Sequence, residues 1–388
     1  MSFPLFSLCF GSFHEYPLFV SQYHDLIYGH YPKPRWNTGF YGSTTRQDRV
    51  SSLSGSPKVV NVDDFGAKGN GQDDSKAFEL AWKEACSSSK AMILVPKGRT
   101  YYLKSITFSG PCRSPLTLKI DGIIKASPRM SDYDHDRRHW LKFEGVDNFV
   151  VEGNGIINGN GKKWWQNSCK VNKELPCRRA PTAVTFYQCI NLVVANLKLE
   201  NAQQMHLTFQ KCTNVQALNL RVVAPENSPN TDGIHVTETQ NVIIKNCVIG
   251  TGDDCISIVS GSRNVRAMDI TCGPGHGISI GSLGAGNSEA EVSNIRVDRA
   301  LISGTSNGVR IKTWQNSAVK VSNVVYKNIR GTSASDDAIR FDCSKSSPCQ
   351  DISMLGVHLV RQGDDVATAS CENVRLKNRW KVYPQCSS

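Results

Sequence analysis

The sequence predicts an all-β protein, specifically a single-stranded right-handed parallel β-helix with an N-terminal capping helix. Composition is the first observation behind this prediction, because 31 glycines among 388 residues and many asparagines favour turns over long helices. The second is a repeated pattern in the C-terminal two thirds of the chain. The third is that each repeat consists of short Val- and Ile-rich segments separated by Gly, Asn or Asp.

The repeat is clearest in pairs of residues five positions apart, with asparagine at the first position and usually at the second. These pairs are Asn191 and Asn196, Asn214 and Asn219, Asn241 and Asn246, Asn264 and Asp269, and Asn323 and Asn328. Successive units span roughly 23 to 30 residues, a period typical of solenoids. One such coil cannot bury its apolar face alone, so coils stack at a strand spacing of about 4.8 Å and equivalent positions line up.

The N-terminal residues 1–57 lack this pattern and are predicted to be a leader and linker outside the fold. They are aromatic at first and then rich in Ser, Thr and Gly from Gly42 to Pro57. Phe3 to Phe10 resembles a short apolar signal segment but has neither a basic region before it nor a clear cleavage site. The predicted catalytic domain is therefore 58–388.

The predicted domain begins with a strand and a helix. The strand covers Val59 to Val62, and a Gly-rich turn follows it. An amphipathic helix runs from about Ser75 to Cys86, begun by Asp73 and Asp74. We expect this helix to cap one end of the solenoid.

Fourteen cysteines indicate an oxidising compartment and hence a secreted protein. Four pairs are close enough in sequence to close small loops and are predicted disulfides: Cys169/Cys177, Cys255/Cys272, Cys343/Cys349 and Cys371/Cys386. Cys189, Cys212 and Cys247 recur at similar places in successive repeats and are predicted to be a stacked row of buried thiols. No apolar run approaches the roughly 20 residues that span a bilayer, which argues against a membrane protein.

The formal net charge of +11 points to a polyanionic partner, namely nucleic acid, an anionic membrane surface or an acidic polysaccharide. Lys and Arg are spread along the chain with no nucleic-acid-binding motif or dense basic run, so nucleic acid is disfavoured. A closed solenoid with capped ends gives no reason to expect a dimer, and a monomer is predicted.

Four short segments interrupt the repeats with charged residues. They are Ser228–Gly233, Gly250–Cys255, Gly273–Gly277 and Arg310–Lys312. Singly, each has an ordinary explanation: Asp and Asn are common in turns, His276 lies between glycines, and Arg310 and Lys312 are typical solvated charges. Their order favours a site, because residues one repeat apart become neighbours on one face of a solenoid.

Three carboxylates in one place can divide acid and base chemistry. Asp253 and Asp254 are adjacent, so both reach one face only if a bend turns one of them. Packing Asp232 beside them raises at least one pKa, which keeps one carboxyl protonated near pH 5. In an inverting glycosidase one such acid protonates the leaving oxygen while another carboxylate activates water across the sugar.

These segments resemble those of plant polygalacturonases, members of glycoside hydrolase family 28, which have a pectin-lyase-like β-helix. The resemblance covers about residues 59–388. It includes all four segments in order and the flanking stretches Gly233–Val236, Cys255–Ile258 and Gly281–Gly284. It also includes an entry phrase from Asn61 through Gly69 to Ala85–Cys86. It implies hydrolysis of the α-1,4 bonds of pectin homogalacturonan with inversion, endo action favoured over exo, in the modification of the extracellular cell wall.

The resemblance also implies roles for the catalytic residues. Asp253 looks like the general acid, and Asp232 with Asp254 looks like the pair that holds and deprotonates the attacking water. His276 would sit against the acid and tune its protonation. No metal or cofactor is implied.

Substrate-binding residues are implied in the same way. Arg310 and Lys312 would grip galacturonate carboxylates, a role that suits a planar guanidinium fork and a mobile ammonium. Asn230 resembles a residue at the substrate subsites, and Gly275 would allow a close backbone approach. The sequence departs from the family where many relatives carry a cleft tyrosine, because Lys345 takes that place.

Two other functions are open at this stage. A pectate lyase has the same fold but uses calcium and an arginine base, and a cluster of acids suits a hard cation as well. A non-catalytic wall-binding protein would use only the basic cleft, although retaining three acids disfavours polyanion binding. Chelator resistance separates hydrolase from lyase.

Overall fold

The computed structural model describes residues 6–8, 56–113, 115–314, 317–363 and 366–386. The predicted leader and linker, 1–57, thus lie outside the described residues except for β1 (Phe6–Leu8) and residues 56–57.

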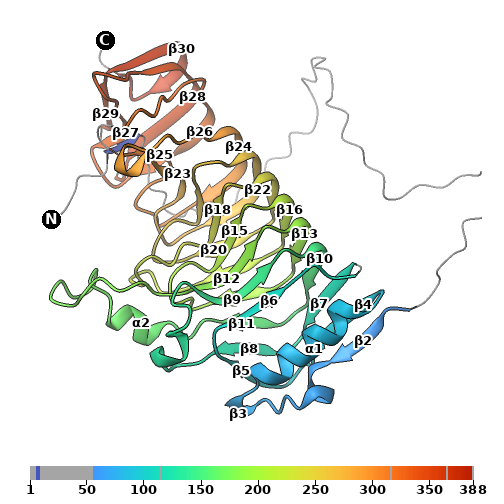
Figure 1. Cartoon of the computed structure of the whole chain (residues 1–388). Coiled ribbons are helices and arrows are strands. Elements are labelled where there is room, and N and C mark those ends of the chain that lie inside the picture. The colour runs from blue at the N-terminus through green and yellow to red at the C-terminus, as the bar shows by residue number, and fades with distance from the viewer. Residues whose placement is uncertain (1–5, 9–55, 114, 315–316, 364–365, 387–388) are drawn as a thin grey trace, which may run out of the picture. The chain divides into compact units, whose positions relative to one another are not determined.

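Strands from successive coils pair side by side in long ladders, which appear in Figure 1 as arrows stacked from the blue end to the red end. Within the described residues every strand pairing is parallel except that of β1 with β25. The nine-stranded ladder consists, in spatial order, of β1, β25 (Val309–Thr313), β23 (Ile278–Leu283), β21 (Ile256–Ile258), β18 (Ile234–Thr237), β15 (Leu207–Gln210), β12 (Thr182–Tyr187), β9 (His139–Glu144) and β6 (Ile106–Ser109).

The other two sides of the coil join into one sheet through the long strand β22 (Arg263–Cys272). One side contains β2 (Lys58–Asn61), β4 (Ala91–Val95), β7 (Leu116–Ile120), β10 (Asp147–Glu152), β13 (Ile190–Ala195), β16 (Thr213–Leu218) and β19 (Gln240–Lys245). The other contains β20 (Val248–Gly250), β17 (Arg221–Val223), β14 (Lys198–Glu200), β11 (Ile156–Asn158), β8 (Ile123–Ala126), β5 (Thr100–Leu103) and β3 (Asn70–Asp73). β24 (Ser293–Ile302) pairs with β22.

The C-terminal coils form two smaller sheets. One contains β26 (Val325–Ser333), β28 (Cys349–Arg361) and β30 (Val374–Tyr383), and the other β27 (Asp337–Asp342) and β29 (Thr368–Glu372). Short helices connect strands elsewhere: η1 (Val62–Phe65), η2 (Met130–Tyr133), α2 (Lys162–Gln166) and η3 (Ala285–Asn287). The predicted parallel β-helix is confirmed, and its first strand is displaced by one residue from the prediction.

The predicted capping helix is α1 (Ser75–Ser87), which covers the N-terminal end of the core. Trp82 packs against Phe108 and Phe143, with ring centroids 5.0 and 5.6 Å away. The helix begins at Ser75, directly after Asp73 and Asp74, as predicted, but the Asp74 side chain does not cap it. Asp74 accepts hydrogen bonds from two backbone amides of the preceding turn instead, and Asp73 accepts from the backbone N of Ser75.

The core is a set of stacked rows because equivalent positions are in register. Phe108, Phe143, Phe186 and Phe209 stack coil upon coil, with ring centroids 5.1 to 5.8 Å apart. Farther along the same ladder Val236 and Ile258 continue the row. All of these side chains are at most 5% exposed, so the row forms a continuous apolar core.

The asparagine repeat forms a second kind of row at the corners of the coils. Each side-chain Nδ2 donates to Oδ1 of the asparagine one coil earlier, at 2.7 to 3.0 Å. The row consists of Asn148, Asn191, Asn214, Asn241, Asn264 and Asn294, all with positive φ. Asparagine tolerates this left-handed conformation better than most residues, which explains why the repeat is visible in the sequence.

The four predicted disulfides are confirmed, and the sequence analysis missed a fifth between Cys86 and Cys112. Cys189, Cys212 and Cys247 are buried free thiols, as predicted. The prediction that the three thiols stack in one row is wrong for Cys247. Strand register aligns Cys189 with Cys212 but places Cys247 at a different corner, because each coil has more than one turn. Among the described helices, none is long and apolar enough to cross a membrane.

Candidate active site

The four charged segments meet along the nine-stranded ladder, just before or within its consecutive strands β18, β21, β23 and β25. The first residues of these strands are in register: Ile234, Ile256, Ile278 and Val309. Asp232, Asp254 and His276 each lie two positions earlier and therefore occupy equivalent places on successive coils. The predicted convergence of these segments is confirmed.

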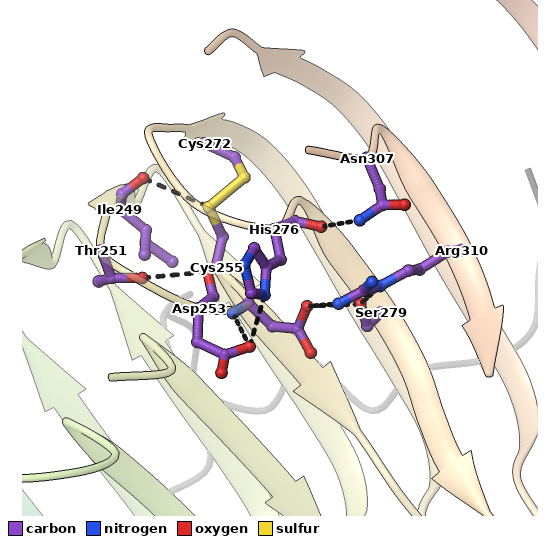
Figure 2. Close-up of a disulfide and its surroundings, with 10 residues drawn as sticks. Ile249, Thr251, Asp253, Cys255, Cys272, His276, Ser279, Asn307 and Arg310 are labelled. Carbon is purple, nitrogen blue, oxygen red and sulfur yellow. Dashed lines mark hydrogen bonds and ion pairs between the residues drawn. A yellow bond between two sulfur atoms is a disulfide. The ribbon is translucent and has the colours of Figure 1, made fainter. Parts of the chain in front are cut away.

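The two adjacent acids lie in a bend that precedes β21. Gly252 makes the bend possible, because a Cβ there would lie 2.0 Å from the backbone oxygen of Ser228. The disulfide between Cys255 and Cys272 joins this bend to the segment that carries His276, as Figure 2 shows. Two segments from neighbouring coils are thus covalently fixed beside the acids.

Asp253 contacts a residue of the coil on either side. Its Oδ1 lies 2.9 Å from Nδ1 of His276, and its Oδ2 accepts from Nδ2 of Asn230 at 3.3 Å (Figure 2 shows the His276 contact). Burial opposes ionisation of Asp253, but the hydrogen bond and the charge of His276 outweigh it and lower the pKa of this carboxyl. Gly275 packs against the same residue, since a Cβ there would lie 2.5 Å from the Asp253 backbone oxygen.

Asp254 is held by cations on both of its oxygens. Oδ1 accepts from Nη2 of Arg310 at 2.7 Å and from Oγ of Ser279 at 2.7 Å. Oδ2 accepts from Nζ of Lys312 at 3.0 Å. The Asp254 side chain is 3% exposed and the two cationic side chains 13% and 10%, so these ion pairs are nearly dry and hold the carboxyl group in a fixed position.

Asp232 is the third acid and has a different environment. Burial, and then the charges of Asp253 and Asp254, raise its pKa to about 8. Its Oδ2 accepts from Oγ of Ser257 at 2.8 Å. That serine oxygen in turn lies 2.8 Å from Nδ1 of His235, whose pKa burial lowers to about 4.

A row of four polar side chains contacts the acids or their partners, and three of them, His235, Ser257 and Ser279, were not predicted as site residues, whereas the fourth, Arg310, was. His235, Ser257, Ser279 and Arg310 occupy equivalent positions on β18, β21, β23 and β25. Each serine donates to an aspartate of the preceding coil, and both serines are at most 1% exposed. The available signal was a serine between two isoleucines on each of two neighbouring strands, where alternation places the serine opposite the core-facing residues.

Comparison with known proteins identifies the family. The model for glycosyl hydrolases family 28 matches residues 86–329 and 315–382. The chain belongs to this family. It is 51% identical to polygalacturonase QRT2 of Arabidopsis thaliana, over 98% of this chain and 96% of that protein. It is 53% identical to polygalacturonase-2 of Solanum lycopersicum, over 85% and 81% of the two chains.

Solved structures confirm the fold of this family 28 glycoside hydrolase. A polygalacturonase from Erwinia carotovora matches with a TM-score of 0.65 and 22% identity, over 86% of this chain and all of that one. An endo-xylogalacturonan hydrolase from Aspergillus tubingensis matches with a TM-score of 0.69 and 21% identity, over 84% and 99%. The predicted right-handed parallel β-helix is confirmed by these likenesses together with the strand pairing.

The donor groups of this family 28 site include one combination that could hold a cation. Ligand atoms of Asp253, Asp254 and His276 lie within 4.8 Å of one another. Both oxygens of Asp254 already accept from cationic side chains, so a metal ion would have to displace Arg310 and Lys312 or bear their repulsion. Calcium also prefers six to eight oxygen ligands and no nitrogen. The charge arrangement therefore suits acid–base chemistry better than a hard-cation site.

Proposed function

We propose that this family 28 enzyme is a polygalacturonase that hydrolyses α-1,4 bonds between galacturonic acid residues of homogalacturonan. The observation that carries the proposal is the cluster of Asp232, Asp253 and Asp254. In this cluster the cations Arg310 and Lys312 bind Asp254, and His276 contacts Asp253. Membership of a glycosyl hydrolase family supports the reaction, and relatives at about half identity named polygalacturonases support the substrate.

Asp253 acts as the general acid in this proposal. Its side chain is 15% exposed whereas that of Asp254 is 3% exposed, so Asp253 is the better placed of these neighbours to reach a leaving oxygen. His276 and Asn230 hold one oxygen each, which fixes the orientation of the carboxyl. Protonation of the glycosidic oxygen breaks the bond to the anomeric carbon, and the leaving sugar departs with a new hydroxyl group.

The proton that this acid needs is retained by the cluster as a whole. Three neighbouring carboxylates repel one another and burial disfavours their charge, which together favour keeping one carboxyl of the cluster protonated. In the free protein the raised pKa of Asp232 and the lowered pKa of Asp253 place that proton on Asp232. General acid catalysis by Asp253 thus includes transfer of the proton from Asp232 when the anionic substrate covers the site.

After that transfer Asp232 and Asp254 are both anionic and can hold the attacking water. The water adds to the anomeric carbon from the face opposite the leaving oxygen and gives its proton to the pair, so the configuration inverts. Ser257 donates to one oxygen of Asp232, and Ser279 donates to one oxygen of Asp254. These hydrogen bonds keep the two carboxylates oriented when the water arrives.

Arg310 and Lys312 bind substrate as well as Asp254 in this proposal. A guanidinium has five N–H donors and an ammonium three, more than the contacts to Asp254 and Ser279 use. The remaining donors can take a galacturonate carboxylate beside the scissile bond. Asn230 and Gly275 line the Asp253 side, where they hold the acid and permit its close approach.

The proposed setting is the plant cell wall, where the secreted enzyme modifies and degrades pectin. Five disulfides support folding in an oxidising compartment. A net charge of +11 favours association with a polyanionic wall polymer over nucleic acid or membrane. We propose a monomer that attacks chain interiors and needs no metal or cofactor.

The testing experiment measures reducing-end release from de-esterified polygalacturonate at about pH 5, with and without chelator. The wild-type protein and Asp253→Asn are compared, and replacing the acid is expected to lower the rate a hundredfold or more. Proton NMR of the first products reports the anomer and so tests inversion. A fast fall in viscosity relative to reducing ends indicates endo action.

Each alternative predicts a different result. Unsaturated products that disappear with chelator would establish a lyase and overturn the proposal. Tight polymer binding without turnover by folded wild-type protein would establish a binding module. Chelator-resistant hydrolysis that Asp253→Asn abolishes supports the hydrolase.

A further inference from the structure

A strongly basic segment follows β11 and precedes β12. It contains six basic residues and one acidic residue, Glu174, a net charge of +5. The basic residues are Lys162, Lys163, Lys170, Lys173, Arg178 and Arg179, and all are exposed. We call residues 162–179 the basic arm. In Figure 1 its green trace, which begins with α2, protrudes from the stacked coils.

The basic arm leaves the solenoid at the same edge as the catalytic acids. It returns to the coil at the start of β12, and the acids lie before the starts of β18 and β21 in the same ladder. β12 is two strands from β18, a distance of about 10 Å at the usual strand spacing. The charge of Lys170 is near enough to contribute to the lowered pKa of Asp253. The strand order and the effect of Lys170 on the pKa of Asp253 therefore both place the arm near the catalytic acids.

The arm is held in place at its base and across its tip. Trp164 is buried and packs edge-on against Tyr133, with ring centroids 5.4 Å apart. Nε1 of Trp165 donates to the backbone oxygen of Ala202 at 3.0 Å. The Cys169–Cys177 disulfide closes the tip. A pre-shaped segment loses less conformational freedom on binding a ligand than a free loop does.

The arm carries a single acidic residue, Glu174, against its six basic ones. Within the described part of the chain none of the six forms an ion pair with a carboxylate. Cations on the neighbouring coils behave differently, since Lys142 pairs with Glu144 and Lys198 pairs with Glu200. Six like charges on one short segment repel one another, which favours a bound polyanion.

We propose that the basic arm is a secondary binding site for galacturonate carboxylates of the polymer, away from the bond that is cleaved. The proposal rests on the polygalacturonase function. A substrate chain that crosses the acids at β18 and β21 continues along the ladder toward β12, where the arm contacts it. Contacts to several sugars at once raise the affinity for long chains but do not help short ones. The arm thereby gives the enzyme a preference for long, de-esterified substrate.

The test neutralises the arm with four substitutions, Lys170→Gln, Lys173→Gln, Arg178→Gln and Arg179→Gln. A matched control removes four charges from β30 at the other end of the solenoid, with Arg375→Gln, Lys377→Gln, Arg379→Gln and Lys381→Gln. Both sets lower the net charge equally, and all eight residues are exposed, so neither set should unfold the protein. Each set is combined with Asp253→Asn, and binding of polygalacturonate is measured at low and at high salt.

The arm variant is expected to bind long polygalacturonate about tenfold more weakly at low salt and to lose much of the salt dependence. The control should stay within about twofold of the parent. In an otherwise wild-type background, KM should rise on the polymer and stay unchanged on trigalacturonate. Equal binding by the arm variant and its parent would overturn the proposal, as would equal losses in arm and control variants. Binding by the Asp253→Asn protein is independent of turnover, so failure of the hydrolase function remains a separate result.

Discussion

Nδ1 of His276 and Oδ1 of Asp253 lie 2.9 Å apart although 23 residues separate them in the sequence. The separation is one coil plus one residue, so the chain returns beside Asp253 one strand farther along the ladder. Two further contacts hold the pair together. The backbone N of His276 donates to the backbone oxygen of Asp253 at 2.8 Å, and the Cys255–Cys272 disulfide joins their segments.

The Cys255–Cys272 disulfide should affect both stability and catalysis. Replacing both cysteines with alanine frees the segments that carry Asp253 and His276, and small displacements there are costly. We expect about 3 kcal/mol less stability, from the loop-closure effect for a separation of 17 residues, and at least a tenfold lower kcat. Thermal unfolding and reducing-sugar release measure the two effects.

The Cys371–Cys386 disulfide provides the matched control. It closes a loop of similar length, with a separation of 15 residues, among the C-terminal strands. Removing it should lower stability by a similar amount and leave kcat within about twofold at a temperature where the protein is folded. Equal losses of kcat in both variants would contradict a specific role for Cys255–Cys272.

Gly275→Ala should impair catalysis more than stability. The new Cβ would lie 2.5 Å from the Asp253 backbone oxygen, so the acid has to move. We expect kcat to fall roughly a hundredfold, because misplacement by about 1 Å has effects of that size. Gly304→Ala is the control, since φ is also positive there but nothing lies within 4 Å of its Cβ position. The control should lose about 1 kcal/mol of stability, and unchanged kcat in Gly275→Ala would refute this interpretation.

Ser257→Ala should lower kcat with little change in KM. The serine donates to Oδ2 of Asp232, and a hydrogen bond to a charged group contributes enough to change rates roughly ten- to a hundredfold. Loss of this donor also raises the pKa of Asp232, so the limb of the pH profile that Asp232 controls moves to higher pH. Ser257→Thr keeps the hydroxyl and should retain the wild-type profile. Identical profiles for the alanine variant and wild type would show that the serine has no positioning role.

The pH dependence of stability should report the raised pKa of Asp232. Its pKa is about 8 in the folded protein and about 3.9 unfolded, so folding favours the protonated form. The stability from this group is complete below about pH 4 and is lost as pH rises through 8. The lowered pKa of Asp253 has the opposite effect, confined to pH values below the ordinary aspartate pKa of 3.8.

Asp232→Asn removes this titration and is the direct test. Between pH 4 and pH 8, the free energy of unfolding of the wild type should fall by a few kcal/mol more than that of the variant. Urea unfolding at a series of pH values measures the difference. Parallel curves for the two proteins would show that Asp232 does not titrate in this range.

Much of the fold is predictable from local sequence because every coil repeats the same requirements. Asn191 and Asn214 are visible as a repeat since the left-handed corner admits few residue types. Helix α1 is visible because its apolar face follows the helical period. The Cys86–Cys112 disulfide was not predicted, since it links the end of α1 to the turn after β6 and no repeat marks that contact.

The sequence by itself determined the β-helix and the stacking of the four charged segments, because repeat spacing converts directly into spatial alignment. Only the tertiary structure decided the partners of Asp232 and Asp254. Arg310 and Lys312 both bind Asp254, Ser257 binds Asp232, and Cys247 leaves the row of Cys189 and Cys212. These outcomes depend on side-chain direction and on the corner at which each residue lies. Both are set by packing between coils. The spacing of residues along the sequence does not show this packing.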